Sequence, residues 1–251
     1  MKIATVNYCG TVGKTTIAAN LLIPRLKGDT VFSIESINGD MSTNGVKSNK
    51  LRGDKFSKFY DEIVLEDDAV VDIGASNVES FLNQMITYDG GFDLIDLYII
   101  PVVSGEKEKK ESIQTAITLI DIGISPKNIR FILNRAGVDY EDDFKEIFNA
   151  AKKLKIHLND EYVIRENDLF RLLEKSNRTI LDAINDKEDH KIKAKSLKIK
   201  ANELEESGDF VNAKKYKSES LSEVQLMKQQ AMARTLIESF DTVYEAICKR
   251  L

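Results

Sequence analysis

The sequence predicts an α/β fold: a doubly wound, mainly parallel sheet followed by a C-terminal helical hairpin extension. Two observations predict the sheet. Short β-rich runs alternate with amphipathic helical patterns, the order typical of βαβ units, and residues 98–103 form a continuous apolar run, as expected for a strand buried on both faces. The third observation predicts the extension: beyond Asp186, glycine and proline almost vanish and long charged helical patterns take over.

The predicted elements alternate along the first 186 residues. Strands are expected at 2–7, 30–35, 69–73, 97–103 and 129–134, with a weaker one at 155–158. Helices are expected between them, at 15–26, 77–88, 107–122 and 141–154. Five strands with intervening helices complete a doubly wound sheet without the rest of the chain.

The remaining residues divide into a hairpin and a final helix. Small and apolar residues recur at helical spacing on both sides of Ser207-Gly208-Asp209, which predicts a helical hairpin. A last amphipathic helix, at 235–250, is expected to pack back on the sheet. We therefore predict a core at 1–186, a helical hairpin at 187–230 and a C-terminal helix at 231–251.

Composition limits the classes of function. The 251 residues are 42% hydrophobic and 31% charged, enough apolar residues for a core, and the net charge of −5 gives no global positive field to attract nucleic acid or an anionic membrane. Only two cysteines are present, which excludes a disulfide framework. With no signal-type stretch and no long apolar segment, the expected location is the cytoplasm, without a membrane.

A phosphate-binding loop is predicted where the first strand meets the first helix. Gly10 and Gly13 let the backbone curl so that N–H groups point at a phosphate, Lys14 would reach the β- and γ-phosphates, and the Thr15 hydroxyl would ligate Mg²⁺. The strict motif has glycine where Tyr8 stands, and the alternative is a chance Gly-Lys-Thr in a βα turn. The expected nucleotide-binding residues of the loop are Gly10, Thr11, Val12, Gly13, Lys14, Thr15 and Thr16.

A carboxylate at the end of another strand would complete such a site. The apolar run that begins at Ala69 ends in Asp72-Ile73-Gly74, and Asp72 would hold the Mg²⁺ shell, mostly through water because Mg²⁺ dehydrates reluctantly. An aspartate after an apolar run is also a common strand end. Its position about 60 residues after the loop favours the metal role.

Residues 7–16 resemble the deviant Walker A motif of the ParA/MinD-type P-loop ATPases, usually Asn-Gln-Lys-Gly-Gly-Val-Gly-Lys-Thr-Thr, which also lacks glycine at the Tyr8 position. Residues 72–76 are similar to the Walker B motif of that family, and Asn134-Arg135 matches the position that binds adenine. The start of the chain and residues 72–77 look most similar to the plasmid-stability branch StbB. The resemblance covers about residues 1–185 and the last helix.

Two departures from the family concern hydrolysis. Cys9 stands where the family has the lysine that reaches the phosphates of a partner subunit, and a thiol cannot supply that cation. Glu35 keeps the first carboxylate of the strand-two motif, but Ile37 replaces the aspartate that orients water, with Asp40 nearby. Since positioned charge dominates phosphoryl transfer, slow or partner-completed hydrolysis is expected.

The resemblance implies an ATP hydrolase that uses ATP and Mg²⁺ as a switch in plasmid partition or DNA positioning. It implies Lys14, Asp72 and Glu35 as catalytic residues, a DNA-binding adaptor protein, nonspecific DNA contact and a nucleotide-dependent homodimer. One alternative is a nucleotide-binding scaffold with little hydrolysis that recognises a protein through its helical hairpin. Another is a ligase or kinase similar to dethiobiotin synthetase, which no additional polar cluster supports. The lysine run at 191–200 is either a solvated helix face or a DNA-backbone contact.

Overall fold

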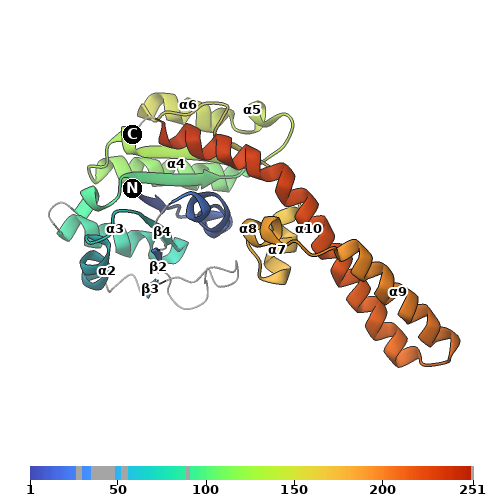
Figure 1. Cartoon of the computed structure of the whole chain (residues 1–251). Coiled ribbons are helices and arrows are strands. Elements are labelled where there is room, and N and C mark those ends of the chain that lie inside the picture. The colour runs from blue at the N-terminus through green and yellow to red at the C-terminus, as the bar shows by residue number, and fades with distance from the viewer. Residues whose placement is uncertain (27–29, 35–48, 52–55, 89–90, 250–251) are drawn as a thin grey trace. The chain divides into compact units, whose positions relative to one another are not determined.

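The computed structural model describes residues 1–26, 30–34, 49–51, 56–88 and 91–249. The chain forms two compact units, one made of Met1–Asn167 and Ser239–Leu251 and the other of Asp168–Glu238. Figure 1 shows the elements of each unit. The boundary at 167/168 lies before the predicted start of the hairpin at Lys187, because two short helices precede the hairpin in the second unit.

In the part of the chain that the structure describes, the first unit is built on a parallel sheet of seven strands, ordered β3-β2-β4-β1-β5-β6-β7. The strands are β1 (Lys2–Thr5), β2 (Val31–Ile34), β3 (Asn49–Leu51), β4 (Ala69–Ile73), β5 (Leu97–Val102), β6 (Ile129–Ala136) and β7 (Val163–Arg165). The predicted doubly wound parallel sheet is therefore confirmed. β3 was not predicted, because three residues without an apolar run give no strand signal.

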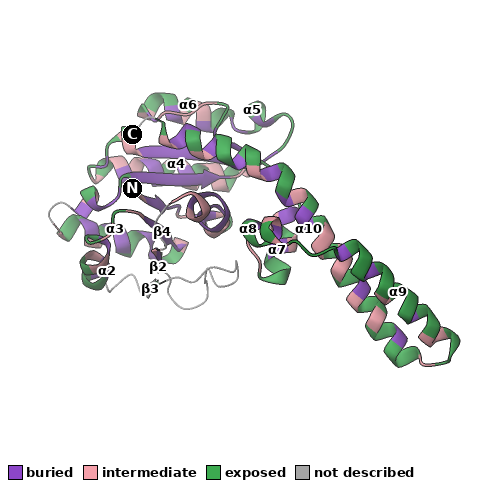
Figure 2. Ribbon diagram, viewed as in Figure 1, coloured by how far each residue is buried: buried purple, intermediate pink, exposed green. Residues whose placement is uncertain are grey.

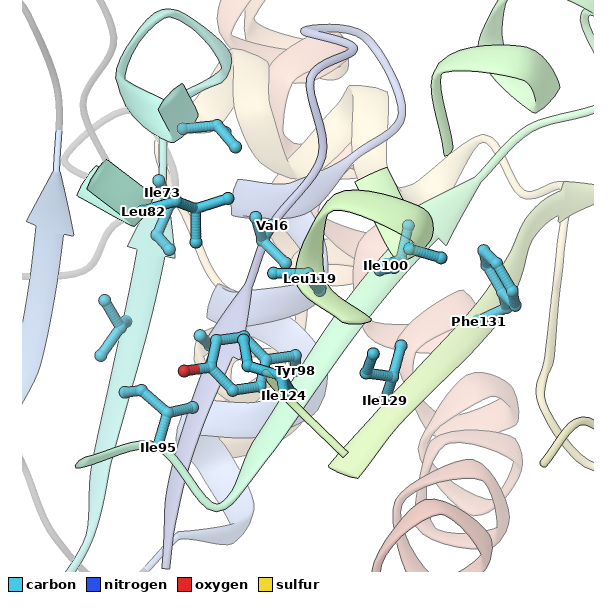
Figure 3. Packing of buried hydrophobic residues seen from close by; sticks show 14 of the residues in the cluster. Val6, Ile73, Leu82, Ile95, Tyr98, Ile100, Leu119, Ile124, Ile129 and Phe131 are labelled. Carbon is cyan, nitrogen blue, oxygen red and sulfur yellow. The ribbon is translucent and has the colours of Figure 1, made fainter. Parts of the chain in front are cut away.

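Burial explains why the central strands form. Every residue of β5 is buried, and its register with β6 places Ile100 opposite Phe131. Figure 3 shows side chains of both strands packed with Val6, Tyr98 and other residues of the core. Strands covered on both faces need apolar side chains at consecutive positions, which is the pattern that the sequence has.

Helices cover the faces of this sheet. They are α1 (Lys14–Ile17), α2 (Phe56–Ile63), α3 (Val78–Thr87), α4 (Glu106–Asp121), α5 (Tyr140–Asp143) and α6 (Lys145–Leu154). The predicted helix at 15–26 changes type: α1 continues as a π-helix at Ala18–Leu22 and a 3₁₀-helix at Ile23–Arg25. The predicted helix at 141–154 is interrupted at Phe144, which separates α5 from α6.

The weak strand predicted at 155–158 is wrong. Lys155 has a left-handed backbone (φ 58°) and ends α6, and the residues after it are not paired as a strand. Ile156 nevertheless packs into the core, so its apolar character reflects burial without strand pairing. β7 (Val163–Arg165) takes the place beside β6 instead.

The last part of α10 (Phe210–Cys248) belongs to the first unit. Phe240, Val243 and Ile247 are buried, and the Tyr162 hydroxyl donates a hydrogen bond of 3.3 Å to the Ala246 carbonyl oxygen. Arg25 forms an ion pair with Asp241 at 2.8 Å. Residues 239–248 therefore pack in the first unit, although they are far in sequence from its other residues.

The second unit contains α7 (Leu169–Ser176), α8 (Ile180–Asn185), α9 (His190–Glu206) and the first part of α10. α9 and α10 are joined at Gly208, whose φ of 88° favours glycine. Figure 2 shows buried residues at intervals along both helices, and the Ser220 hydroxyl of α10 donates to the Ala194 carbonyl oxygen of α9 at 2.8 Å. The two helices predicted at the end of the chain are one continuous helix, α10. Within the described ranges, no helix has both the length and the apolar character to cross a membrane.

A buried histidine connects α9 to the rest of the second unit. His190 Nδ1 lies 2.5 Å from Glu223 Oε2, and Nε2 lies 2.9 Å from Asp186 Oδ2. Arg178 forms an ion pair with the same Asp186 oxygen at 2.7 Å. Burial disfavours the charged ring, but the hydrogen bonds with Glu223 and Asp186 raise the pKa of His190 above its ordinary value. The protonated ring, with two donors, satisfies both carboxylates.

This geometry predicts a pH-dependent stability. Because the folded pKa of His190 is raised, its contribution is complete below the unfolded pKa of about 6.5 and is lost as pH rises through the folded pKa. We expect His190→Gln to lower the free energy of unfolding by about 1–3 kcal/mol at about pH 6 and by less at about pH 9. Urea unfolding followed by circular dichroism checks this. Glu223→Gln should reduce the same pH dependence, and an equal loss at both pH values would contradict the assignment.

Candidate phosphate-binding site

The predicted phosphate loop lies at the carboxyl ends of the central strands, where ligands bind in doubly wound folds. The loop follows β1 and leads into α1, and Val6 N–H still pairs with the Ile99 carbonyl oxygen of β5 at 2.9 Å. Asp72 near the end of β4 and Asn134 near the end of β6 reach this region from other strands. The sheet order therefore brings together residues that are up to about 120 positions apart.

Gly13 sits at the sharpest point of the loop. Its φ is +90°, a left-handed conformation, and a Cβ on it would lie 2.5 Å from Asn134 Nδ2. Both the backbone conformation and the space therefore require glycine. Gly10 differs, because a Cβ there would meet only the Ala75 Cβ, at 4.0 Å.

Lys14 is 95% buried and folds back over its own loop. Its Nζ donates hydrogen bonds to the carbonyl oxygens of Asn7 at 3.1 Å and Cys9 at 2.7 Å. A buried ammonium group must be compensated, and two backbone oxygens do so here. The arrangement places a cation inside the curl of the loop.

Asp72 joins the loop to β4. Its carboxylate accepts hydrogen bonds of 2.6 Å from the hydroxyls of Thr15 and Thr5. Burial of Asp72, which is 1% exposed, raises its pKa; the hydrogen bonds from Thr15 and Thr5 and the positive charge of Lys14 act in the opposite direction. Carboxylate and hydroxyl oxygens side by side are the ligand types that Mg²⁺ prefers.

The described residues contain no group of three or more His, Cys, Asp or Glu side chains that could hold a metal ion. This result does not conflict with a magnesium site at Thr15 and Asp72. Mg²⁺ usually takes one or two carboxylates and completes its shell with water and substrate phosphates.

Asn134 braces the loop from β6. Its buried Nδ2 donates to the Val12 carbonyl oxygen at 2.8 Å, and its Oδ1 accepts from Arg135 N–H at 3.0 Å. Arg135 is exposed and has a left-handed φ of 53°. Asn134 is thus engaged with the loop, whereas the Arg135 side chain faces solvent.

The remaining predicted residues differ in exposure. Gly10 and Thr11 are exposed, Val12 is fully buried, and Thr16 is half-buried. The carbonyl oxygen of Thr16 accepts a hydrogen bond of 3.0 Å from Asn20 Nδ2. Glu35 lies outside the described residues, as do Ile37 and Asp40.

Cys9, at the position of the family lysine, is buried. Its Sγ lies 3.7 Å from Thr11 Oγ1, and its N–H donates to Asn7 Oδ1 at 2.8 Å. The thiol packs within its own loop and offers no charge to a neighbouring molecule.

Among the described residues, Thr5, Ser112 and Thr115 contact the site elements and were not predicted, whereas Asn7 stands in the predicted motif but was given no role in the site. Ser112 and Thr115 interrupt the buried face of α4, where Ala116 and Leu119 are apolar. Polar residues on an otherwise apolar helix face were the signal available in the sequence.

Comparisons with known proteins give a match at the level of fold. No protein-family model and no curated protein sequence matches the chain. Among solved structures, an ATP complex of McdA from Cyanothece matches with a TM-score of 0.51 and 12% identity, over 72% of this chain and 89% of that protein. The MinC:MinD cell division complex of Aquifex aeolicus matches with a TM-score of 0.50 and 17% identity, over 72% and 88%. The similarity confirms the predicted P-loop NTPase type of α/β fold for the first unit.

Proposed function

We propose that this protein is a ParA-like ATP-binding switch that acts in plasmid partition or in the positioning of DNA. The observation that carries the proposal is the 2.6 Å hydrogen bond between Thr15 at the start of α1 and Asp72 of β4. This hydrogen bond brings the two proposed metal ligands into contact, and the positive charge of Lys14 also acts on Asp72, which supports a site for phosphoryl transfer. The ATP complex of McdA and the MinC:MinD complex support the family assignment through their similar fold.

Each site residue receives a role in this proposal. Lys14 turns from the carbonyl oxygens of its loop to the β- and γ-phosphates, and the N–H groups of residues 10–16 surround the β-phosphate. The left-handed backbone at Gly13 gives the loop the tight curl that a cradle of N–H groups around a phosphate needs. Thr15 and Asp72 hold Mg²⁺, which neutralises phosphate charge when it is bound.

Other residues are assigned to the adenine ring and to hydrolysis. We assign the adenine side of the site to Asn134 and Arg135, with Asn134 also holding the loop through Val12. Glu35 is proposed as a further acidic group for catalysis. Because the buried thiol of Cys9 replaces a cation, intrinsic hydrolysis is expected to be slow or to need stimulation by a partner.

The partners follow from the same assignment. We propose a nucleotide-dependent homodimer in the cytoplasm that engages a DNA-binding adaptor protein and makes nonspecific contacts with DNA. Within the family, we propose the plasmid-stability branch StbB, because residues 1–25 and 72–77 resemble that branch.

A second candidate is a nucleotide-binding scaffold with little hydrolysis. The burial of Cys9 favours it, because this position supplies no charge across a subunit interface. The helical hairpin at 187–230 would then be the surface that recognises a protein partner. ATP turnover measured with and without DNA and a candidate adaptor separates the two: stimulation favours the switch, and unchanged low turnover favours the scaffold.

Asp72→Asn tests the proposed metal role. Asparagine keeps the shape of aspartate and can still form hydrogen bonds with both threonine hydroxyls, but it removes the negative charge that would attract a metal ion. We expect the variant to be as stable as the wild type but to lose the increase in ATP affinity that Mg²⁺ produces. Calorimetric titration with and without Mg²⁺ measures this.

The control for Asp72→Asn is Asp68→Asn. Asp68 lies just before β4 and forms an ion pair with the Met1 amino group, at the end of β1 opposite to the loop. It should keep the full Mg²⁺ effect. A Mg²⁺ effect of the wild-type size in Asp72→Asn would show that this carboxylate does not serve the metal.

A further inference from the structure

Asn7 is completely buried at the point where β1 becomes the phosphate loop. Its Nδ2 donates hydrogen bonds to the Pro101 carbonyl oxygen at 2.8 Å and to Ser112 Oγ at 2.7 Å. Its Oδ1 accepts from Cys9 N–H at 2.8 Å. The Pro101 carbonyl can only accept, so it fixes which end of the amide is Nδ2. One side chain thus connects β5, α4 and the loop.

Two hydroxyls of α4 complete this connection. Ser112 Oγ donates to the Glu108 carbonyl oxygen at 2.7 Å, which leaves its lone pair for Asn7 Nδ2. Thr115 Oγ1 donates to the Glu111 carbonyl oxygen at 2.7 Å and accepts the Tyr8 N–H at 3.2 Å. We call Asn7, Ser112 and Thr115 the loop clamp.

The loop clamp acts on the backbone that holds the lysine. It binds the N–H groups of Tyr8 and Cys9, one through Thr115 and the other through the Asn7 side chain. The carbonyl oxygens of Asn7 and Cys9 are the acceptors of the Lys14 ammonium group. Fixing these peptide groups therefore fixes the shape of the loop backbone around Lys14 before any ligand arrives.

We propose that Asn7, Ser112 and Thr115 are positioning residues that preorganise the phosphate loop, and that α4 thereby sets the affinity of the site for the diphosphate group of a nucleotide. The inference rests on the proposed function and adds α4 to the site. A loop that is already ordered loses less conformational freedom when a ligand binds, so weakening the clamp lowers affinity even where the fold persists.

Thr115→Val tests the proposal because valine keeps the shape of threonine and removes the acceptor of Tyr8 N–H. With ADP as the probe, at a temperature where every variant is folded, we expect the Kd to rise about ten-fold, which corresponds to about 1.4 kcal/mol. Thr115→Ser keeps the hydroxyl and should restore affinity to near the wild-type value. Thr118→Val makes the same chemical change on α4 but outside the clamp, and it should leave the Kd unchanged.

The outcomes distinguish the possible failures. If Thr115→Val lowers the melting temperature but binds ADP as the wild type does, the clamp is only structural and the inference is overturned. Should Thr115→Val fail to fold, Ser112→Ala, which removes one partner of Asn7 Nδ2, gives the same comparison. If the wild type itself does not bind ADP, the proposed function fails and the inference fails with it, a result that differs from loss of affinity in the variants alone.

Discussion

Lys14→Ala is expected to remove measurable binding of ATP and ADP. The variant loses the buried cation that lies inside the loop, while the loop N–H groups remain in place. Charge-assisted hydrogen bonds from lysine to phosphate are among the strong interactions of such sites. A loss of about 3 kcal/mol corresponds to an affinity at least about 100-fold weaker. Calorimetric titration of the variant with ADP measures the effect.

Lys107→Ala is the matched control for Lys14→Ala. Lys107 lies on the exposed side of α4, where its Nζ is 3.7 Å from Glu111, and its removal should not change the affinity. Unfolding curves should show that Lys14→Ala is folded at the temperature of the titration, although the buried carbonyl oxygens of Asn7 and Cys9 lose their hydrogen bonds from the lysine. Wild-type affinity in Lys14→Ala would remove the basis for a phosphate site in this loop.

Gly13→Ala is expected to destabilise the first unit strongly. A left-handed backbone costs a residue with a Cβ about 1–2 kcal/mol, and the Cβ would lie 2.5 Å from Asn134 Nδ2, an overlap that costs about 1–3 kcal/mol. The free energy of unfolding should therefore fall by about 2–5 kcal/mol. Urea unfolding measures the change. Gly10→Ala, which has open space and no left-handed φ, should alter stability by less than about 1 kcal/mol.

A double variant separates the two costs at Gly13. Asn134→Ala removes the atom that the new Cβ would meet, so Gly13→Ala should cost less in the Asn134→Ala background than in the wild type. The destabilisation that remains in this background is the cost of the left-handed backbone at position 13. Equal effects of Gly13→Ala and Gly10→Ala would contradict the geometry described for the loop.

The central strands and the loop could be predicted because their signals are local. β4 and β5 are uninterrupted apolar runs, and residues 10–16 form a contiguous motif between a strand and a helix. Burial on both faces imposes the first pattern, and the second is the pattern that phosphate binding by backbone N–H groups would require. Asp72 was found for the same reason, since it stands in an apolar run at a set distance from the loop.

The edges of the sheet could not be predicted in this way. Residues 155–158 and 163–165 are similarly short and partly apolar, and only pairing with β6 distinguishes them. The loop clamp was missed because Asn7 and Ser112 are 105 positions apart and meet only when α4 packs with its present register. The single helix α10 was predicted as two helices, although neither glycine nor proline occurs between Phe210 and Cys248.

The central claim is that residues 10–16 bind the phosphates of a nucleotide, and backbone amide NMR of the ¹⁵N-labelled chain during titration with ADP tests it most directly. Binding at this loop predicts saturable shifts concentrated at the N–H groups of Thr11, Gly13, Lys14 and Thr15, with none at Lys195 or Lys198 of α9. Titration of Lys14→Ala should abolish the shifts at the other loop amides. Saturable shifts confined to α9 and α10, or no shifts at millimolar ADP, would contradict the claim.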